Sequence, residues 1–149
     1  MVINLYQLMN KKYYFNFNFL VINMHELSYA TSIVNAILDY INKMENGNKI
    51  KKVSKINLEI GELTFINFEQ LKFAFEVASE GTLCKGAELY AEFLKPQILC
   101  NNCGYKGDLK ANDEFDVKCP KCDNIHIKVS GGKEFNIKNA VLESDDEIK

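Results

Sequence analysis

The sequence predicts an α+β fold in which two helices cover a three-stranded mixed sheet and a four-cysteine module is inserted into one strand connection. Three observations lead to this expectation. Two segments carry apolar residues at three- and four-residue intervals, as amphipathic helices do. Three shorter segments alternate apolar and polar residues, as half-buried strands do. Four of the five cysteines form two Cys-x-x-Cys pairs, at 100–103 and 119–122.

Residues 1–23 differ in composition from the rest of the chain. The stretch is rich in Asn, Tyr, Phe and Lys, and two asparagines interrupt its apolar run from Tyr13 to Ile22. This run is too short to span a bilayer and lacks the small-residue cleavage site of a signal peptide, so no membrane association is expected. The ordinary globular pattern begins at Met24. We therefore expect an atypical N-terminal extension, with Met24 as a candidate start of translation.

The first predicted helix covers residues 25–44, where the apolar residues recur on one helical face. A polar run that contains Gly47 is expected to end it. Apolar and polar residues then alternate over 56–60, which predicts the first strand, and Gly61 is expected to end that strand.

The second predicted helix begins after Asn67. Asn67 and Gln70 have the spacing of a capping box, in which the first side chain accepts a hydrogen bond from the backbone N–H of the second residue. The apolar residues behind them continue at helical spacing and stop before Gly81. Alternation over 88–93 predicts the second strand.

The four-cysteine module has the spacing of a zinc ribbon. Paired thiolates separated by residues 104–118 can surround a tetrahedral ion, and Zn²⁺ accepts four sulfur ligands. Because four thiolates leave no open position for a water molecule, we expect a structural or signalling site without hydrolytic activity. Few large apolar residues surround the pairs, so zinc is expected to hold the module together. The predicted zinc ligands are Cys100, Cys103, Cys119 and Cys122.

Disulfides in a secreted protein and a redox dithiol are the alternatives for these cysteines. Cys119-Pro120-Lys121-Cys122 has the form of a redox motif. Such a motif needs one pair only, whereas here a second pair stands at zinc-ribbon distance. The fifth cysteine, Cys84, is expected to be a small, partly buried residue without chemistry. A spare thiol beside thiolate ligands points to a reducing cytoplasm.

The C-terminal part is expected to return to the main sheet. Alternation over 125–129 predicts a ribbon strand, and a run from Phe135 predicts the last strand. His126 is expected to be an exposed strand residue, with replacement of a thiolate ligand as the alternative. The predicted domains are an α+β domain of residues 24–95 and 131–143, a zinc domain of residues 96–130, and an acidic tail of residues 144–149.

Charge and motifs argue against several classes of function. The net charge is −2 and the pI about 5.7, which argues against a nucleic-acid-binding ribbon because neutralising phosphates needs a surplus of Lys and Arg. The chain contains no glycine-rich phosphate loop and no Ser-His-Asp order, so the sequence predicts no enzyme.

Several short motifs, collinear over residues 24 to about 143, together resemble the HypA/HybF family. They are Met24-His25-Glu26-Leu27-Ser28, Ile60-Gly61-Glu62-Leu63, Phe73-Ala74-Phe75-Glu76, Glu80-Gly81-Thr82 with Gly86-Ala87, the two cysteine pairs, and Gly132-Lys133-Glu134. The resemblance implies a nickel metallochaperone for maturation of [NiFe] hydrogenase, with urease served in some members. It also implies a partner GTPase of the HypB type and delivery of nickel to the hydrogenase large-subunit precursor.

The resemblance further implies a nickel site at Met24, His25 and Glu26. The ligands would be the terminal amine of Met24, the backbone nitrogens of His25 and Glu26, and the His25 imidazole. Planar, nitrogen-rich coordination suits Ni(II) and disfavours tetrahedral Zn(II). If residues 1–23 remain attached, Met24 has no free amine, and this site cannot form as described.

Two other functions remain open at this point. A zinc-ribbon scaffold could bind protein or nucleic acid with His25 incidental, and a thiol oxidoreductase could use Cys119 and Cys122. The sequence also leaves open whether the protein forms a homodimer.

Overall fold

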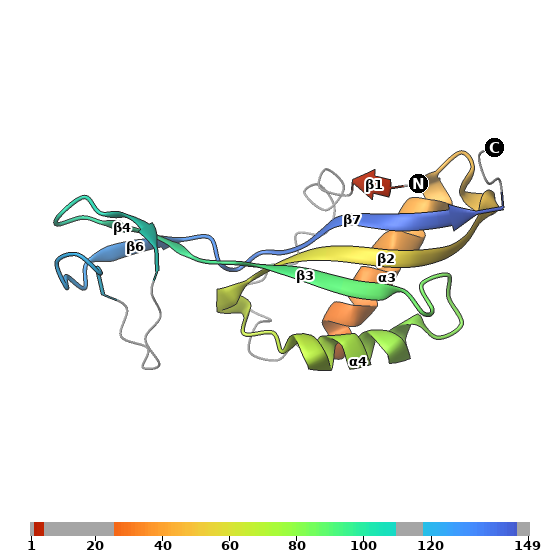
Figure 1. Cartoon of the computed structure of the whole chain (residues 1–149), viewed down its shortest axis with the longest axis horizontal. Helices are drawn as coiled ribbons and strands as arrows, with labels where there is room; N and C mark the ends of the chain where they lie inside the picture. Colours follow the sequence, from red (N-terminus) through yellow and green to blue (C-terminus); the bar gives the residue numbers. More distant parts are fainter. Residues whose placement is uncertain (1, 5–25, 110–117, 146–149) are drawn as a thin grey trace. The chain divides into compact units, whose positions relative to one another are not determined.

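The computed structural model describes residues 2–4, 26–109 and 118–145 (Figure 1). The chain divides into two units, each described by itself. Unit 1 comprises residues 1–59, 66–92 and 136–149, and unit 2 comprises residues 60–65 and 93–135. The elements are β1 (Val2–Asn4), α3 (Glu26–Lys43), β2 (Ile50–Gly61), α4 (Phe68–Ser79), β3 (Glu88–Leu94), β4 (Gln97–Cys100), β5 (Lys106–Asp108), β6 (Ile127–Ser130) and β7 (Phe135–Ser144), with single 3-10 turns at Gly47–Lys49 and Glu62–Thr64.

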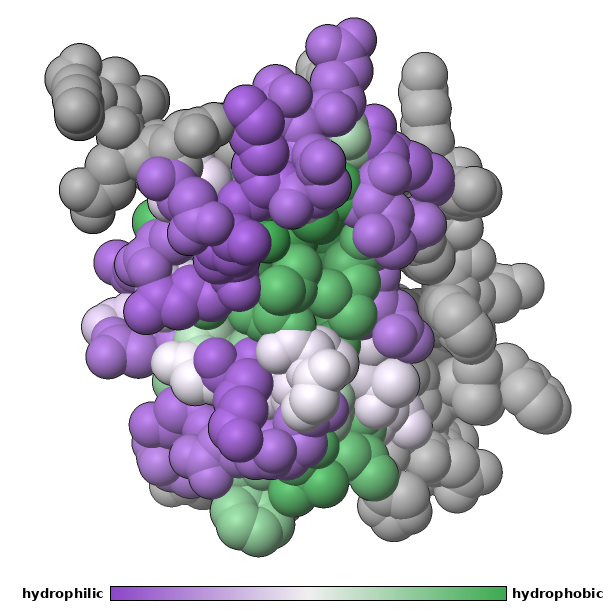
Figure 2. All heavy atoms as spheres, turned by 90° about the vertical axis from the view of Figure 1, so that its right-hand side faces the viewer, coloured by the Kyte–Doolittle hydropathy of each residue, from purple (hydrophilic) through white to green (hydrophobic). Residues whose placement is uncertain are grey.

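Unit 1 contains the two helices and most of a four-stranded sheet of order β1-β7-β2-β3. Helix α3 crosses the sheet, and α4 packs against α3 and runs alongside β3 (Figure 1). Seen from the right-hand side of Figure 1, hydrophilic side chains surround a central area of hydrophobic ones (Figure 2). The largest fully buried side chains of this unit come from both helices, β2 and β7: Ile33, Ile37, Ile41, Val53, Ile56, Leu58, Leu71, Phe75, Ile137 and Leu142.

Both helices confirm the sequence pattern that predicts them. Helix α3 buries most of the apolar residues that recur at helical spacing, together with Tyr29, whereas Leu27 at its start is exposed. At the start of α4, the side chain of Asn67 accepts a hydrogen bond from the Gln70 backbone N–H at 3.1 Å. This cap satisfies one of the backbone donors that a helix N-terminus leaves without a partner.

The sheet confirms the α+β class and differs from the prediction in two places. Strand β2 begins at Ile50, inside the polar run that was expected to separate helix and strand. Lys51 and Lys52 are exposed there and form ion pairs with Asp145 and Glu143, so a polar stretch is compatible with this end of the strand. A fourth strand, β1, pairs antiparallel with β7 and was not predicted.

Unit 2 holds a three-stranded antiparallel sheet of order β5-β4-β6. Ile98 on the central strand lies opposite Gly107 on one side and Val129 on the other, and its side chain is buried. Gly61 also belongs to this unit, and its backbone N–H donates to the carbonyl of Glu134 at 2.7 Å. Among the helices of the described residues, none is both long and apolar enough to cross a membrane.

Candidate metal centre

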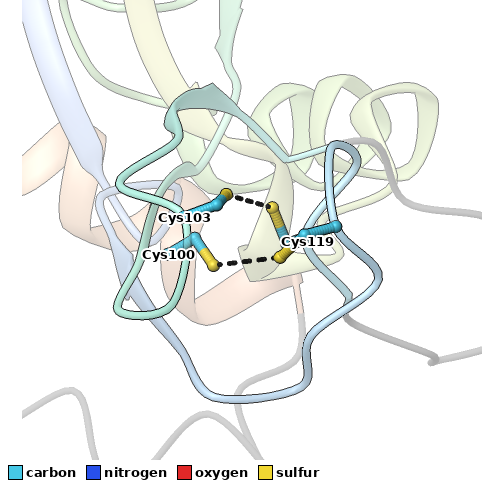
Figure 3. A group of neighbouring side chains, drawn as sticks. Cys100, Cys103 and Cys119 are labelled. Carbon is cyan, nitrogen blue, oxygen red and sulfur yellow. Dashed lines mark hydrogen bonds between the residues drawn. The ribbon is translucent and has the colours of Figure 1, made fainter.

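The four predicted zinc ligands come together in unit 2. All four Sγ atoms lie within 4.8 Å of one another. Cys100 is the last residue of β4, and the second pair begins at Cys119, beyond the residues that the structure leaves undescribed. Figure 3 shows Cys100 and Cys103 on one turn and Cys119 on the facing turn, with their sulfurs directed toward one another.

The sulfur spacing fits a tetrahedral ion and excludes disulfides among these residues. The Sγ atoms of Cys100 and Cys122 are 3.6 Å apart, and those of Cys103 and Cys119 are also 3.6 Å apart. A disulfide would need about 2.0 Å. Four sulfurs at about 2.3 Å from a central ion stand about 3.8 Å from one another in a tetrahedron. The arrangement therefore has the dimensions of a four-thiolate site.

Each cysteine pair is carried by the same kind of turn. The N–H of Cys100 donates to the carbonyl of Tyr105 at 2.8 Å, and its own carbonyl accepts from Gly104 at 3.0 Å. In the second turn, the N–H of Cys119 donates to the carbonyl of Asn124 at 2.9 Å, and its carbonyl accepts from Asp123 at 2.9 Å. The two cysteine turns thus have the same pattern of backbone hydrogen bonds.

Hydrogen-bond donors around the sulfurs favour the thiolate form. The backbone N–H of Lys121 donates to Cys119 Sγ at 3.4 Å. The side-chain amide of Asn102 donates to Cys122 Sγ at 3.7 Å and so links the two turns. This second contact was not predicted from the sequence. The only feature of the sequence that indicates this contact is an amide side chain between two cysteines.

The pKa values within the site differ in direction. Donation from the Cys103 backbone N–H is the largest influence on Cys100 and lowers the pKa of that thiol to about 6. For Cys103, the N–H of Tyr105 favours the thiolate, but desolvation and three neighbouring thiols outweigh it and raise the pKa to about 12. Cys100 therefore forms a thiolate easily, whereas formation of the Cys103 thiolate conflicts with its desolvation and its neighbouring thiols. A divalent cation removes that conflict.

The structure describes only part of the predicted nickel site. Met24 and His25 lie outside the described residues. Glu26 is the first residue of α3, where its carboxylate complements the positive end of the helix dipole. It also raises the pKa of Tyr29, after desolvation by burial, which is the larger cause.

The two remaining residues singled out from the sequence lie outside the cluster. Cys84 is completely buried in unit 1, where we expected partial burial, and burial raises its thiol pKa to about 11. His126 is exposed, as predicted, but precedes β6 instead of lying within it. Its backbone N–H donates to Asn124 Oδ1 at 2.7 Å, and its carbonyl accepts from Asn101.

Comparison with known proteins identifies the family. A family model described as "Hydrogenase/urease nickel incorporation, metallochaperone, hypA" matches residues 24–142. A protein of Methanococcus aeolicus called hydrogenase maturation factor HypA is 79% identical over 123 residues, which cover 83% of this chain and 100% of the relative. A protein of the same name from Methanocaldococcus jannaschii is 62% identical over 124 residues, with the same coverage of both chains.

A solution structure of the nickel metallochaperone HypA from Helicobacter pylori is also similar, at 24% identity and a TM-score of 0.49, covering 82% of this chain and 100% of that one. The assignment to a family rests on the family model and on the two relatives named above, because they align with most of the chain, including both cysteine pairs. The chain belongs to the HypA family of hydrogenase and urease nickel-incorporation factors, which are metallochaperones and not enzymes.

Proposed function

We propose that this protein binds Ni(II) at Met24, His25 and Glu26, holds zinc at its four cysteines, and delivers the nickel to the [NiFe] hydrogenase large-subunit precursor together with a HypB-type GTPase. The observation that carries the proposal is the family match, which begins at Met24 and extends through both cysteine pairs. In this function, nickel is the cargo and zinc is the resident ion.

The assignment of zinc to the cysteines is supported by the geometry of their sulfurs. Zn²⁺ has no geometric preference from its d-electrons and accepts four thiolates in a tetrahedron, whereas square-planar nitrogen coordination is typical of Ni(II). The two 3.6 Å sulfur pairs, one across each side of the facing turns, match the former. Cys100, Cys103, Cys119 and Cys122 would hold the ion, and the ion would join the two turns.

The assignment of nickel to the N-terminal residues follows from chemistry and from the family. An amine and an imidazole can anchor the metal so that the intervening amide nitrogens become ligands. Glu26 belongs to unit 1 and the cysteines to unit 2, so the proposal assigns the two metals to different units. We retain domains of residues 24–95 with 131–143 for nickel and 96–130 for zinc as part of the proposal.

Nickel titration of four proteins tests this function. The full chain, a protein that starts at Met24, and the latter with His25→Ala or His126→Ala are each titrated with Ni²⁺ against a chromophoric chelator. His126→Ala is the matched control, because it removes the other histidine at an exposed position. We expect one nickel per chain in the Met24-start protein and in His126→Ala, and at least about tenfold weaker binding in His25→Ala.

The result for the full chain separates the proposed ligand set from other nitrogen donors. With Met24 inside a longer chain, no terminal amine is available there, so its nickel affinity should be lower than that of the Met24-start protein. Equal affinity of these two proteins, or undiminished binding by His25→Ala, would contradict the site. Zinc content, measured on the same samples, should be one per chain throughout.

The pH dependence provides a second test of the ligand set. The amine and the imidazole must both lose a proton before they bind a metal. Their ordinary pKa values are about 7.7 to 8.0 and about 6.5, so nickel affinity should fall as the pH is lowered from 8 toward 6. An affinity that stays constant over this interval would exclude these two ligands.

A further inference from the structure

One edge of the main sheet is open. In the order β1-β7-β2-β3, the short strand β1 pairs with residues 139–141 of β7, whereas β3 has no strand on its outer side in the described part of the chain. An edge strand presents unpaired backbone N–H and C=O groups at alternate residues, and these groups can pair with another extended segment. Within unit 1, the exposed edge comprises residues 88–92.

A groove of about 440 Å³ lies between this edge and helix α4. One face of α4 lines it with Phe75, Glu76 and Ser79, and the strand side contributes Ala87, Glu88 and Leu89. Its volume falls within the range of roughly 300 to 1,000 Å³ that is typical of ligand sites. Phe75 and Leu89 are buried side chains, so the floor is apolar, while the two carboxylates are exposed.

We propose that this groove binds an extended peptide segment of a partner protein, which adds to β3 as a new edge strand and carries alternating apolar and basic side chains. Backbone hydrogen bonds to β3 would supply affinity without sequence preference. Because side chains alternate along a strand, those of the segment on one face would lie beside Leu89 and those on the other face beside Glu88. The proposal concerns unit 1 alone and does not depend on either metal site.

The charges of the groove select a basic segment. The groove contains one cation, Lys72, which is already 2.8 Å from Glu69 and lies over the Phe68 ring. Neither Glu76 nor Glu88 forms an ion pair with any described residue; Glu88 accepts only the Tyr90 hydroxyl, at 2.5 Å. A Lys or Arg from an added strand would provide the missing positive charge.

The same charges argue against a second copy of this chain as the occupant. If two β3 strands paired antiparallel about Tyr90, Glu88 of each would lie opposite Glu92 of the other. Like charges directly opposite one another destabilise a strand pair. A heterologous basic segment avoids this pairing of carboxylates.

Synthetic peptides test the proposal on the full chain. The probes are an acetylated and amidated eight-residue peptide of alternating Val and Lys, its Val and Glu analogue, and the Val and Lys peptide with N-methylated backbone amides on one edge. Calorimetry measures binding, and hydrogen exchange measures protection of the amides in residues 88–92. We expect the basic peptide to bind with a dissociation constant below about 1 mM and to protect alternate β3 amides.

The acidic peptide should bind at least about fivefold more weakly, and the Glu76→Lys/Glu88→Lys variant should reverse that preference. Glu45→Lys, at an exposed position that does not line the groove, should leave it unchanged. The proposal is overturned if no peptide binds, if the N-methylated peptide binds equally well, or if protection appears elsewhere than in β3. A charge preference that Glu45→Lys shifts as much as the groove variant would also overturn it, because it would show attraction by overall charge.

Discussion

Gly104 and Asp123 occupy equivalent positions in the two cysteine turns. Each follows the second cysteine of its pair, and each has a left-handed backbone, with φ of +74° and +58° respectively. Each also donates its N–H to the carbonyl of the first cysteine of its pair, at 3.0 and 2.9 Å. Glycine adopts this conformation without steric cost, and Asp is among the few other residues that tolerate it.

The conformation of Gly104 predicts the effect of a single methyl group. A Cβ at this position would meet no atom within 4 Å, so Gly104→Ala introduces no clash and costs only its left-handed backbone, about 1 to 2 kcal/mol. Because turn formation and metal binding are linked, zinc affinity should fall about 5- to 30-fold in a chelator competition. Asp123→Gly should change it slightly in the opposite direction.

Gly86→Ala is the matched control for Gly104→Ala. Gly86 has φ of +78° and equally open space around it, but it lies in unit 1. Gly86→Ala should lower the free energy of unfolding by a similar amount while leaving zinc affinity unchanged. Equal zinc affinity of wild type and Gly104→Ala would contradict the coupling of the turn to the ion.

Metal removal should unfold unit 2 and spare unit 1. Among the described residues, the large apolar side chains buried in unit 2 are Ile60, Ile98 and Leu109, whereas unit 1 buries ten or more. A structural Zn²⁺ contributes an apparent free energy of about 10 to 16 kcal/mol, which so small a core cannot replace. After chelation, hydrogen exchange should accelerate in β4, β5 and β6 and stay slow in α3. Retained protection in β4 of the metal-free protein would refute this.

The parts of the fold that were predicted from the sequence depend on local signals. Asn67 and Gln70 predict a helix start because the cap involves residues three positions apart, and the two cysteine pairs predict a metal site because each turn is a local structure. Strand β1 depends on its pairing with β7, at the opposite end of the chain, and no local sequence pattern indicates this pairing. The first residues of β2 are lysine-rich, so they do not show the alternation of apolar and polar residues that predicts a strand.

Cys84 should make stability depend on alkaline pH. Burial raises the pKa of its thiol from 9.0 to about 11, although a hydrogen bond with Thr82 opposes this. Because folding raises the pKa, the buried thiol contributes fully to the free energy of unfolding below about pH 9, the pKa of the thiol in the unfolded chain. This contribution is lost as the pH rises through 11. Between pH 8 and 10.5 the loss should be about 2 kcal/mol.

Comparison with Cys84→Ala isolates this effect. The substitution creates a small cavity and lowers stability at every pH, but it abolishes the contribution of this thiol to the pH slope. Urea unfolding of both zinc-loaded proteins at pH 8 and 10.5 measures the difference, since all other titrations are shared. Parallel pH profiles of the two proteins would show that the thiol does not titrate in this range.

Gly61 should tolerate no larger residue, because the structure brings another backbone segment close to it. A Cβ at Gly61 would lie 2.1 Å from the carbonyl carbon and oxygen of Gly132, which are backbone atoms and cannot rotate away. The two segments are also joined by hydrogen bonds of 2.7 Å from Gly61 to Glu134 and from Leu63 to Gly132. Relief of the clash would therefore break these bonds.

We expect Gly61→Ala to lower the free energy of unfolding by about 3 kcal/mol or more in urea titrations, and to accelerate hydrogen exchange at the Gly132-bonded amide of Leu63. Gly81→Ala is the control: φ is +72° and nothing lies within 4 Å, so the cost should be limited to about 1 to 2 kcal/mol of backbone strain. Since the difference between the variants measures the close approach of the two backbones, equal losses would mean that the Gly61 and Gly132 segments do not pack at this distance in solution.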